Sequence, residues 1–127
     1  ALTDELLARI PQPDKYMELK VEGSEIHLRY QDIVYAEHFA HLIYVHTTVQ
    51  KTLATRQSFK TFIVPLKDDT RFFVCGRGVI VNLEHAKDLE GTVFRMADGS
   101  RVFVSQDLLK SARQAFMEFL LQRGRMA

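Results

Sequence analysis

Three histidines close together in this 127-residue chain are its clearest candidates for a metal-binding centre. His38, His41 and His46 form the pattern H-x2-H-x4-H, and imidazole is a common zinc ligand. The spacing fits no common zinc motif, and no neighbouring cysteine or pair of acids completes a ligand set. We therefore expect neither a metal site nor a cofactor.

Cys75, the single cysteine, is the most obvious candidate nucleophile. It ends an apolar run, and a buried cysteine more often packs as a small hydrophobic side chain. The chain contains no G-x-S-x-G, no P-loop and no G-x-G-x-x-G, and Gly76-Arg77-Gly78 is too short to cradle a phosphate alone. The sequence therefore predicts a protein that is not an enzyme.

Three polar interruptions of the apolar pattern favour binding instead. They are Glu37–His41, Gly76–Gly78 and Ser105–Asp107. An arginine between glycines can extend for a bidentate contact with guanine or phosphate, whereas histidine and glutamine offer donors and acceptors to base edges. A helix beginning after Ser105 would add free amides for a phosphate. The three stretches form one site only if the fold brings them together.

Charge is distributed unevenly along the chain. Residues 1–37 carry eight acidic and four basic side chains, a net charge of −4, whereas residues 38–127 carry a net charge of +5. This asymmetry indicates a surface facing a polyanion, although ordinary solvated charge would give the same count.

No apolar run approaches the roughly 18 residues of a membrane helix, and a lone cysteine fits a reducing compartment, so we expect a cytoplasmic protein without membrane contact.

The apolar periodicity predicts mostly strands. Alternation places strands at 16–21, 26–30, 33–36, 42–45, 52–55, 72–75, 79–83, 92–96 and 101–104. Asp98-Gly99 predicts a tight hairpin between the last two strands. This pattern predicts a mainly β fold of short antiparallel sheets in a barrel-like or sandwich-like arrangement, with small helices and a C-terminal helix.

Helical spacing occurs at two places in the main domain. Phe59, Phe62, Ile63 and Leu66 predict a short helix that Ser58 caps and Pro65 limits. Ser105 is expected to cap a helix over 106–122 that ends at Arg123-Gly124-Arg125. The expected apolar face of this helix consists of Leu108, Leu109, Ala112, Phe116, Phe119 and Leu120.

Residues 1–15 are expected to be a separate N-terminal helix and linker. Thr3–Ile10 has the spacing of a short amphipathic helix, and Pro11 and Pro13 end it. The chain starts with Ala, so this segment reads either as the end of an upstream domain or as a helix that packs on the main domain, residues 16–127.

Several stretches occur in an order typical of one family. They are D-I-V-Y-A-E at 32–37, R-Q-S-F at 56–59, F-F-V-C-G-R-G-V-I-V-N-L at 72–83, and D-G at 98–99 followed by V-S at 104–105. The corresponding family patterns are D-I-x-Y-x-E, R-x-S-L, F-x-R-x-H-R-S-x-x-V-N-L, and D-G followed by V-S-R. From about Tyr16 to Leu121 the chain therefore resembles the LytTR family, the DNA-binding output domain of many bacterial two-component response regulators.

The resemblance implies sequence-specific binding of double-stranded DNA in transcription regulation. Loops rather than a recognition helix would enter the major groove, two copies would bind paired direct repeats and bend the DNA, and a receiver domain would precede this one. Base contacts are expected from His41, Arg77 and Gln106, and phosphate or backbone contacts from Lys51, Arg56, Ser58, Ser105, Asp107 and Lys110. Asn82 matches the V-N of the pattern and is interpreted as stabilising a turn.

The sequence departs from the family pattern at three positions in or beside the expected contact residues. Gly76 and Gly78 replace the His and Ser around the arginine, and Gln106 replaces an Arg. These changes predict weaker binding, a different target sequence, or a relative that no longer reads DNA. Two other hypotheses stay open: a non-catalytic protein-interaction or oligomerisation module, and a small-ligand barrel with a histidine-lined mouth.

Overall fold

The computed structural model describes residues 15–126, so the predicted helix over Thr3–Ile10 lies outside the described residues. The strands are β1 Tyr16–Val21, β2 Ser24–Arg29, β3 Ile33–Phe39, β4 Leu42–Thr47, β5 Thr52–Thr55, β6 Phe72–Gly76, β7 Val79–Asn82, β8 Ala86–Glu90, β9 Val93–Met96 and β10 Arg101–Phe103. The helices are α2 Phe59–Ile63 and α3 Leu109–Met126, with 3-10 turns η1 Tyr30–Asp32, η2 Leu83–His85 and η3 Gln106–Leu108.

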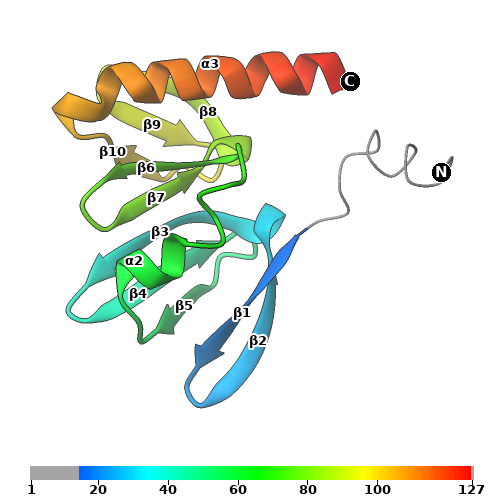
Figure 1. The fold of residues 1–127 in the computed structure, drawn as a ribbon, viewed down its shortest axis with the longest axis vertical. Coiled ribbons are helices and arrows are strands. Elements are labelled where there is room, and N and C mark those ends of the chain that lie inside the picture. Colours follow the sequence, from blue (N-terminus) through cyan, green and yellow to red (C-terminus); the bar gives the residue numbers. More distant parts are fainter. Residues whose placement is uncertain (1–14, 127) are drawn as a thin grey trace, which may run out of the picture.

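The strands form three antiparallel sheets. The orders are β1-β2, β5-β4-β3-β7-β6 and β10-β9-β8. Among the described strands, β3 and β7 are the one neighbouring pair that is not consecutive in the chain. Figure 1 shows α3 over the three-stranded sheet at one end of the molecule and the β1–β2 hairpin at the other. The predicted mainly β fold with small helices and a C-terminal helix is confirmed, and the sheets of the described residues do not close into a barrel.

The central five-stranded sheet is covered on both faces. Its strands accordingly carry apolar side chains on both faces. The first core is Met17, Leu19, Leu28, Tyr30, Ile33, Ala36, Ile43, Val45, Phe62, Leu66, Phe72 and Ile80. It lies between the central sheet, α2 and the β1–β2 hairpin. The second core is Val34, Cys75, Val81, Leu83, Phe94, Met96, Val102, Val104 and Ala112, between the central sheet, β8–β10 and α3.

Asn82 connects two turns at one end of the central sheet. Its side chain is fully buried, and its amide nitrogen donates to the carbonyl oxygens of Tyr30 at 3.1 Å and Ile33 at 2.8 Å. Its side-chain oxygen accepts from the backbone N–H of Glu84 at 2.9 Å. The amide therefore holds η1 and η2 together, which confirms the predicted turn-stabilising role.

The observed ends of the two helices agree to different degrees with the ends predicted from the sequence. Ser58 caps α2 as predicted, since its hydroxyl accepts from the N–H of Thr61 at 3.1 Å. Ser105 directly precedes η3, but its side chain forms no capping hydrogen bond. The expected stop at Arg123-Gly124-Arg125 is wrong, because α3 continues to Met126; one glycine costs a helix only about 1 kcal/mol relative to alanine.

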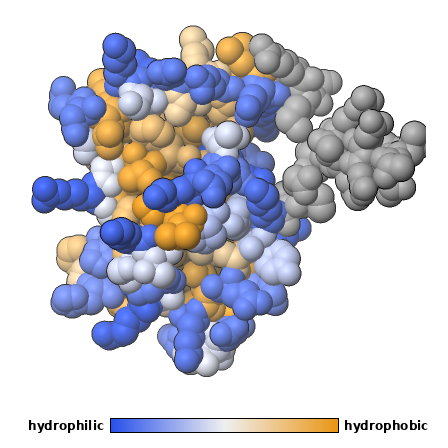
Figure 2. All heavy atoms as spheres, in the orientation of Figure 1, coloured by the Kyte–Doolittle hydropathy of each residue, from blue (hydrophilic) through white to orange (hydrophobic). Residues whose placement is uncertain are grey.

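The packed face of α3 also differs in part from the expectation. The residues of η3 and α3 that belong to the second core or pack against it are Leu108, Ala112, Ala115, Phe116 and Phe119. Leu120 is 44% exposed and was wrongly placed on that face. Apolar side chains gather at the centre of the face in Figure 2 and hydrophilic ones surround them. None of the helices among residues 15–126 has the length and apolar character needed to span a membrane.

Strand β8 was not predicted, because only Ala86 and Leu89 of its five residues are apolar. Pairing with β9 defines it instead. Arg95 donates to both carboxylate oxygens of Asp88, at 2.7 and 2.5 Å, and this contact lowers the pKa of that carboxyl. A polar edge strand of this kind is stabilised by its partner strand rather than by its own periodicity.

Candidate functional site

The three polar loops meet at one end of the central sheet. The backbone N–H of His38 donates to the carbonyl of Gly78 at 2.7 Å, which joins the end of β3 to the β6–β7 turn. The backbone N–H of Ser105 donates to the carbonyl of Cys75 at 2.8 Å, which joins the start of η3 to the end of β6. The structure therefore satisfies the condition on which a shared site depended. We call this end, formed by residues 38–41, 76–78 and 105–107, the loop edge.

The β3–β4 turn is shorter than the expected loop and has a defined backbone. Phe39 pairs with Leu42, so only Ala40 and His41 connect the strands, and their φ angles are +50° and +71°. Two consecutive left-handed residues match the twist of a tight hairpin. This conformation is unfavourable for residues other than glycine, so the pairing of β3 with β4 must hold the turn in place. His41 is therefore presented to solvent on a rigid turn.

Close contacts with the other two loops account for the glycines on both sides of Arg77. Gly78 has a φ of +71°, and a Cβ there would lie 3.0 Å from the Cβ of His38. A Cβ on Gly76 would overlap the hydroxyl of Ser105. The glycines thus allow the three loops to approach closely. Of residues 76–78, Arg77 alone carries a side chain.

The proposed base-reading side chains have no internal partners. His41, Arg77 and Gln106 are exposed, and none of their side chains forms a hydrogen bond or ion pair with another residue between 15 and 126. Asp107 and Lys110 are also exposed, at the start of η3 and α3. Their donors and acceptors are therefore available to a ligand.

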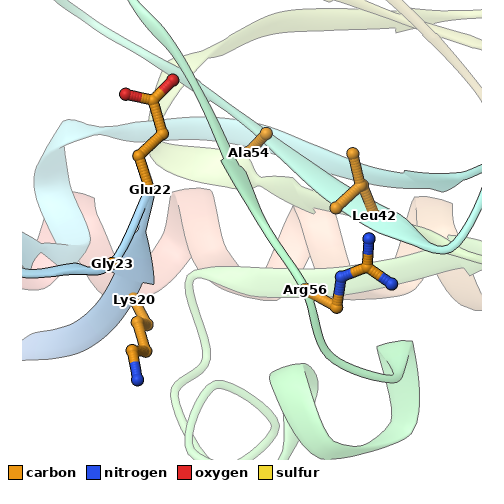
Figure 3. A pocket seen from close by; sticks show the side chains of 6 residues that line it. All are labelled: Lys20, Glu22, Gly23, Leu42, Ala54 and Arg56. Atoms are coloured by element: carbon orange, nitrogen blue, oxygen red, sulfur yellow. The ribbon is translucent and has the colours of Figure 1, made fainter.

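Arg56 extends the loop edge toward a shallow groove. It follows Thr55, which pairs with Ile43, two residues beyond His41. The groove has a volume of about 450 Å³ and is lined by Lys20, Glu22, Gly23, Leu42, Ala54 and Arg56. In Figure 3 the side chain of Arg56 reaches toward Leu42, and Lys20 on β1 and Glu22 in the β1–β2 turn lie across the groove. No histidine lines this groove, so it does not support a histidine-lined ligand site.

Two of the expected phosphate contacts are placed differently. Ser58 is close in sequence to Arg56, but its hydroxyl is engaged with Thr61 in the first turn of α2. Lys51 lies in the β4–β5 turn, where its carbonyl accepts from the N–H of Thr47 at 3.0 Å. That turn is at the end of the central sheet opposite the loop edge, since β4 runs from His41 toward Thr47.

The residues considered for metal binding or catalysis either lie apart from one another or are engaged within the protein. The two ring nitrogens of His46 form hydrogen bonds of 3.2 Å with the side chains of Glu37 and Thr52, and its ring stacks on Tyr35. His38 and His41 are instead exposed at the loop edge. In residues 15–126 no three histidines, cysteines or acids are grouped so as to hold a metal ion. Cys75 is fully buried, and burial raises the pKa of its thiol to about 12. It is therefore a protonated core residue at neutral pH.

Sequence reasoning overlooked one conspicuous residue at the loop edge. Phe39 was treated as part of an ordinary interruption, yet its side chain is 70% exposed beside His41. Strand alternation continues through Tyr35, Glu37 and Phe39, so the sequence pattern gives no sign of this exposure. The structure shows that Phe39 lies beyond the part of β3 that pairs with β7, which begins at Val79 opposite Glu37.

Comparisons with known proteins agree on the fold. The family model for LytTR, described as the LytTr DNA-binding domain, matches residues 24–117, a range that includes all three loops. The structure is similar to the LytTr DNA-binding domain of a Bacillus cereus protein described as a methyl-accepting/DNA response regulator, with a TM-score of 0.67 and 24% identity. The match covers 81% of this chain and 97% of that one. The curated proteins gave no match.

Proposed function

Because the chain belongs to the LytTR family and is a DNA-binding domain of transcription regulation, we propose that its loop edge reads base pairs in the major groove of double-stranded DNA. The expected resemblance to this family is confirmed. His41, Arg77 and Gln106 would contact base edges, and Arg56, Ser105, Asp107 and Lys110 would contact the backbone. Lys51 is not part of this surface, because it lies at the opposite end of the sheet.

One observation carries the proposal: three loops with exposed polar side chains are joined by backbone hydrogen bonds into one edge. Hydrogen-bond donors and acceptors that have no internal partner remain available for base edges. Arginine is the side chain that most often binds the major-groove edge of guanine, through two parallel hydrogen bonds. Glycines on both sides let Arg77 approach a base without hindrance from neighbouring side chains.

We further propose that this domain is the output domain of a bacterial response regulator in the cytoplasm, downstream of a receiver domain. A Bacillus cereus structure of similar fold is described as part of such a regulator, which supports this arrangement. Two copies would bind paired direct repeats, as the resemblance to the family implies. Part of the specificity would then come from bending the DNA between the two sites.

Selection from a random pool of DNA duplexes tests the proposal. We expect enrichment of a specific site, and Arg77→Ala should weaken binding to it by about 1–3 kcal/mol if the arginine makes a bidentate base contact. Arg101→Ala is the matched control, because Arg101 is an exposed arginine at the start of β10, away from the loop edge. Affinity for the selected site is measured by fluorescence anisotropy, and thermal unfolding verifies that both variants fold.

One observation favours a second candidate function, contact with another protein. Met117, Leu120 and Leu121 form an exposed apolar stripe on α3 at helical spacing. A pool without enrichment, together with self-association of the protein at micromolar concentration, would make the interaction module the better conclusion. Equal loss of affinity in both arginine variants would show that Arg77 acts only as general positive charge.

A further inference from the structure

Phe39 occupies an unusual place for a phenylalanine in this fold. Of the nine phenylalanines, seven are buried or half-buried, whereas Phe39 is 70% exposed and Phe103 is 68% exposed. Phe39 is the last residue of β3 and directly precedes the turn that carries His41. Strand alternation places it on the same face as Tyr35, which packs against the second core. β7 begins at Val79, opposite Glu37, so its pairing with β3 does not reach Phe39.

The backbone around Phe39 is held at both ends. On one side the N–H of His38 is bonded to Gly78 at 2.7 Å, and on the other Phe39 pairs with Leu42 across the Ala40–His41 turn. The positive φ angles of these two turn residues leave the connection little freedom. The ring is therefore exposed on a rigid support and not on a mobile loop.

We infer that Phe39 contacts the C5-methyl group of a thymine in the target site, and so distinguishes thymine from cytosine at one position. This inference rests on the proposed function. The thymine methyl is the apolar group on the major-groove edge of the base pairs, and phenylalanine is among the side chains that contact it. Apart from Ala40, whose side chain is a single methyl group and reaches less far than the ring, the other side chains of the loop edge are polar. A ring beside His41 would face the base pair next to the one that the histidine contacts.

Replacement of thymine by uracil in the selected site tests the inference, because it removes the methyl group and leaves every hydrogen-bonding group in place. One such replacement should weaken binding of the unmodified protein about three- to fivefold, the value of one buried methyl group. Phe39→Ala should bind the thymine and uracil duplexes equally. Phe39→Leu should retain part of the preference, since it keeps an apolar side chain. Phe103→Ala removes a phenylalanine of similar exposure on β10, outside the loop edge, and it should keep the full preference.

The outcomes separate this inference from the proposed function. Specific binding that no uracil replacement weakens would overturn the role of Phe39 and leave the proposed function intact. So would a Phe39→Ala variant that prefers thymine as strongly as the unmodified protein. Loss of affinity in Phe39→Ala without a thymine-specific effect would indicate insertion of the ring between base pairs, which also overturns the methyl contact. Failure to select any site would overturn both proposals.

Discussion

At one end of the central sheet, polar side chains bind the protein's own backbone. Asn82 donates to Tyr30 and Ile33, the hydroxyl of Thr47 donates to the carbonyl of Lys51 at 2.8 Å, and His85 bonds to the carbonyl of Gln31 at 2.5 Å. At the loop edge the relation is reversed. There the backbone joins the loops, and the exposed polar side chains at their tips form no bonds within residues 15–126.

This difference shows how a small domain can separate stability from recognition. Bonds from buried side chains to backbone groups stabilise turns, and losing one partner leaves the other group unsatisfied. Side chains at the loop edge have no such role, so they can change without loss of the fold. We expect mutations at the Asn82 end to lower stability and mutations of the exposed side chains at the loop edge to lower DNA affinity.

The largest effect is expected for Asn82→Ala. The substitution leaves the carbonyls of Tyr30 and Ile33 and the N–H of Glu84 without their partner in a buried site. The free energy of unfolding should fall by about 2–4 kcal/mol, measured by urea denaturation. Gln106→Ala serves as the comparison and should change it by less than about 0.5 kcal/mol. Similar losses in the two variants would contradict the separation.

An intermediate effect is expected for Gly78→Ala, where the loop edge itself depends on the backbone. The new Cβ meets His38 at 3.0 Å and the φ of +71° disfavours a side chain, so stability should fall by about 1–3 kcal/mol. Gly91→Ala has a similar φ of +61° but nothing within 4 Å of its Cβ, and it should lose only about 1 kcal/mol. Chemical denaturation of both variants measures the difference. If the two losses are equal, contact with His38 does not constrain Gly78.

The smallest effect is expected in the salt dependence of DNA binding. Lys110→Ala should reduce the slope of log affinity against log salt by about one unit, because one phosphate contact is lost. Lys51→Ala should leave the slope unchanged, because Lys51 lies at the opposite end of the central sheet. Titrations of the selected duplex at four salt concentrations compare the two. A reduced slope for Lys51→Ala would extend the DNA surface beyond the loop edge.

Much of the fold was predictable where a local signal dominates. The Asp98-Gly99 turn, the cap at Ser58 and the alternating strands all depend on residues close to each other in the chain. Strand β8 was missed, because its pairing with β9, including the Arg95–Asp88 contact, determines it rather than its own pattern. The end of α3 was misplaced, because its glycine is a weak stop signal compared with seventeen other helical residues.

The sequence by itself determined most element types, the family and the identity of the candidate side chains, since these follow from residue chemistry and spacing. Only the tertiary structure decided which of them share a surface. Two backbone hydrogen bonds, from His38 to Gly78 and from Ser105 to Cys75, bring together loops that are far apart in the chain. Sheet pairing places Lys51 at the opposite end of the sheet and leaves Phe39 beyond the first residue of β7. Long-range pairing of this kind depends on register across strands, and no local pattern encodes it.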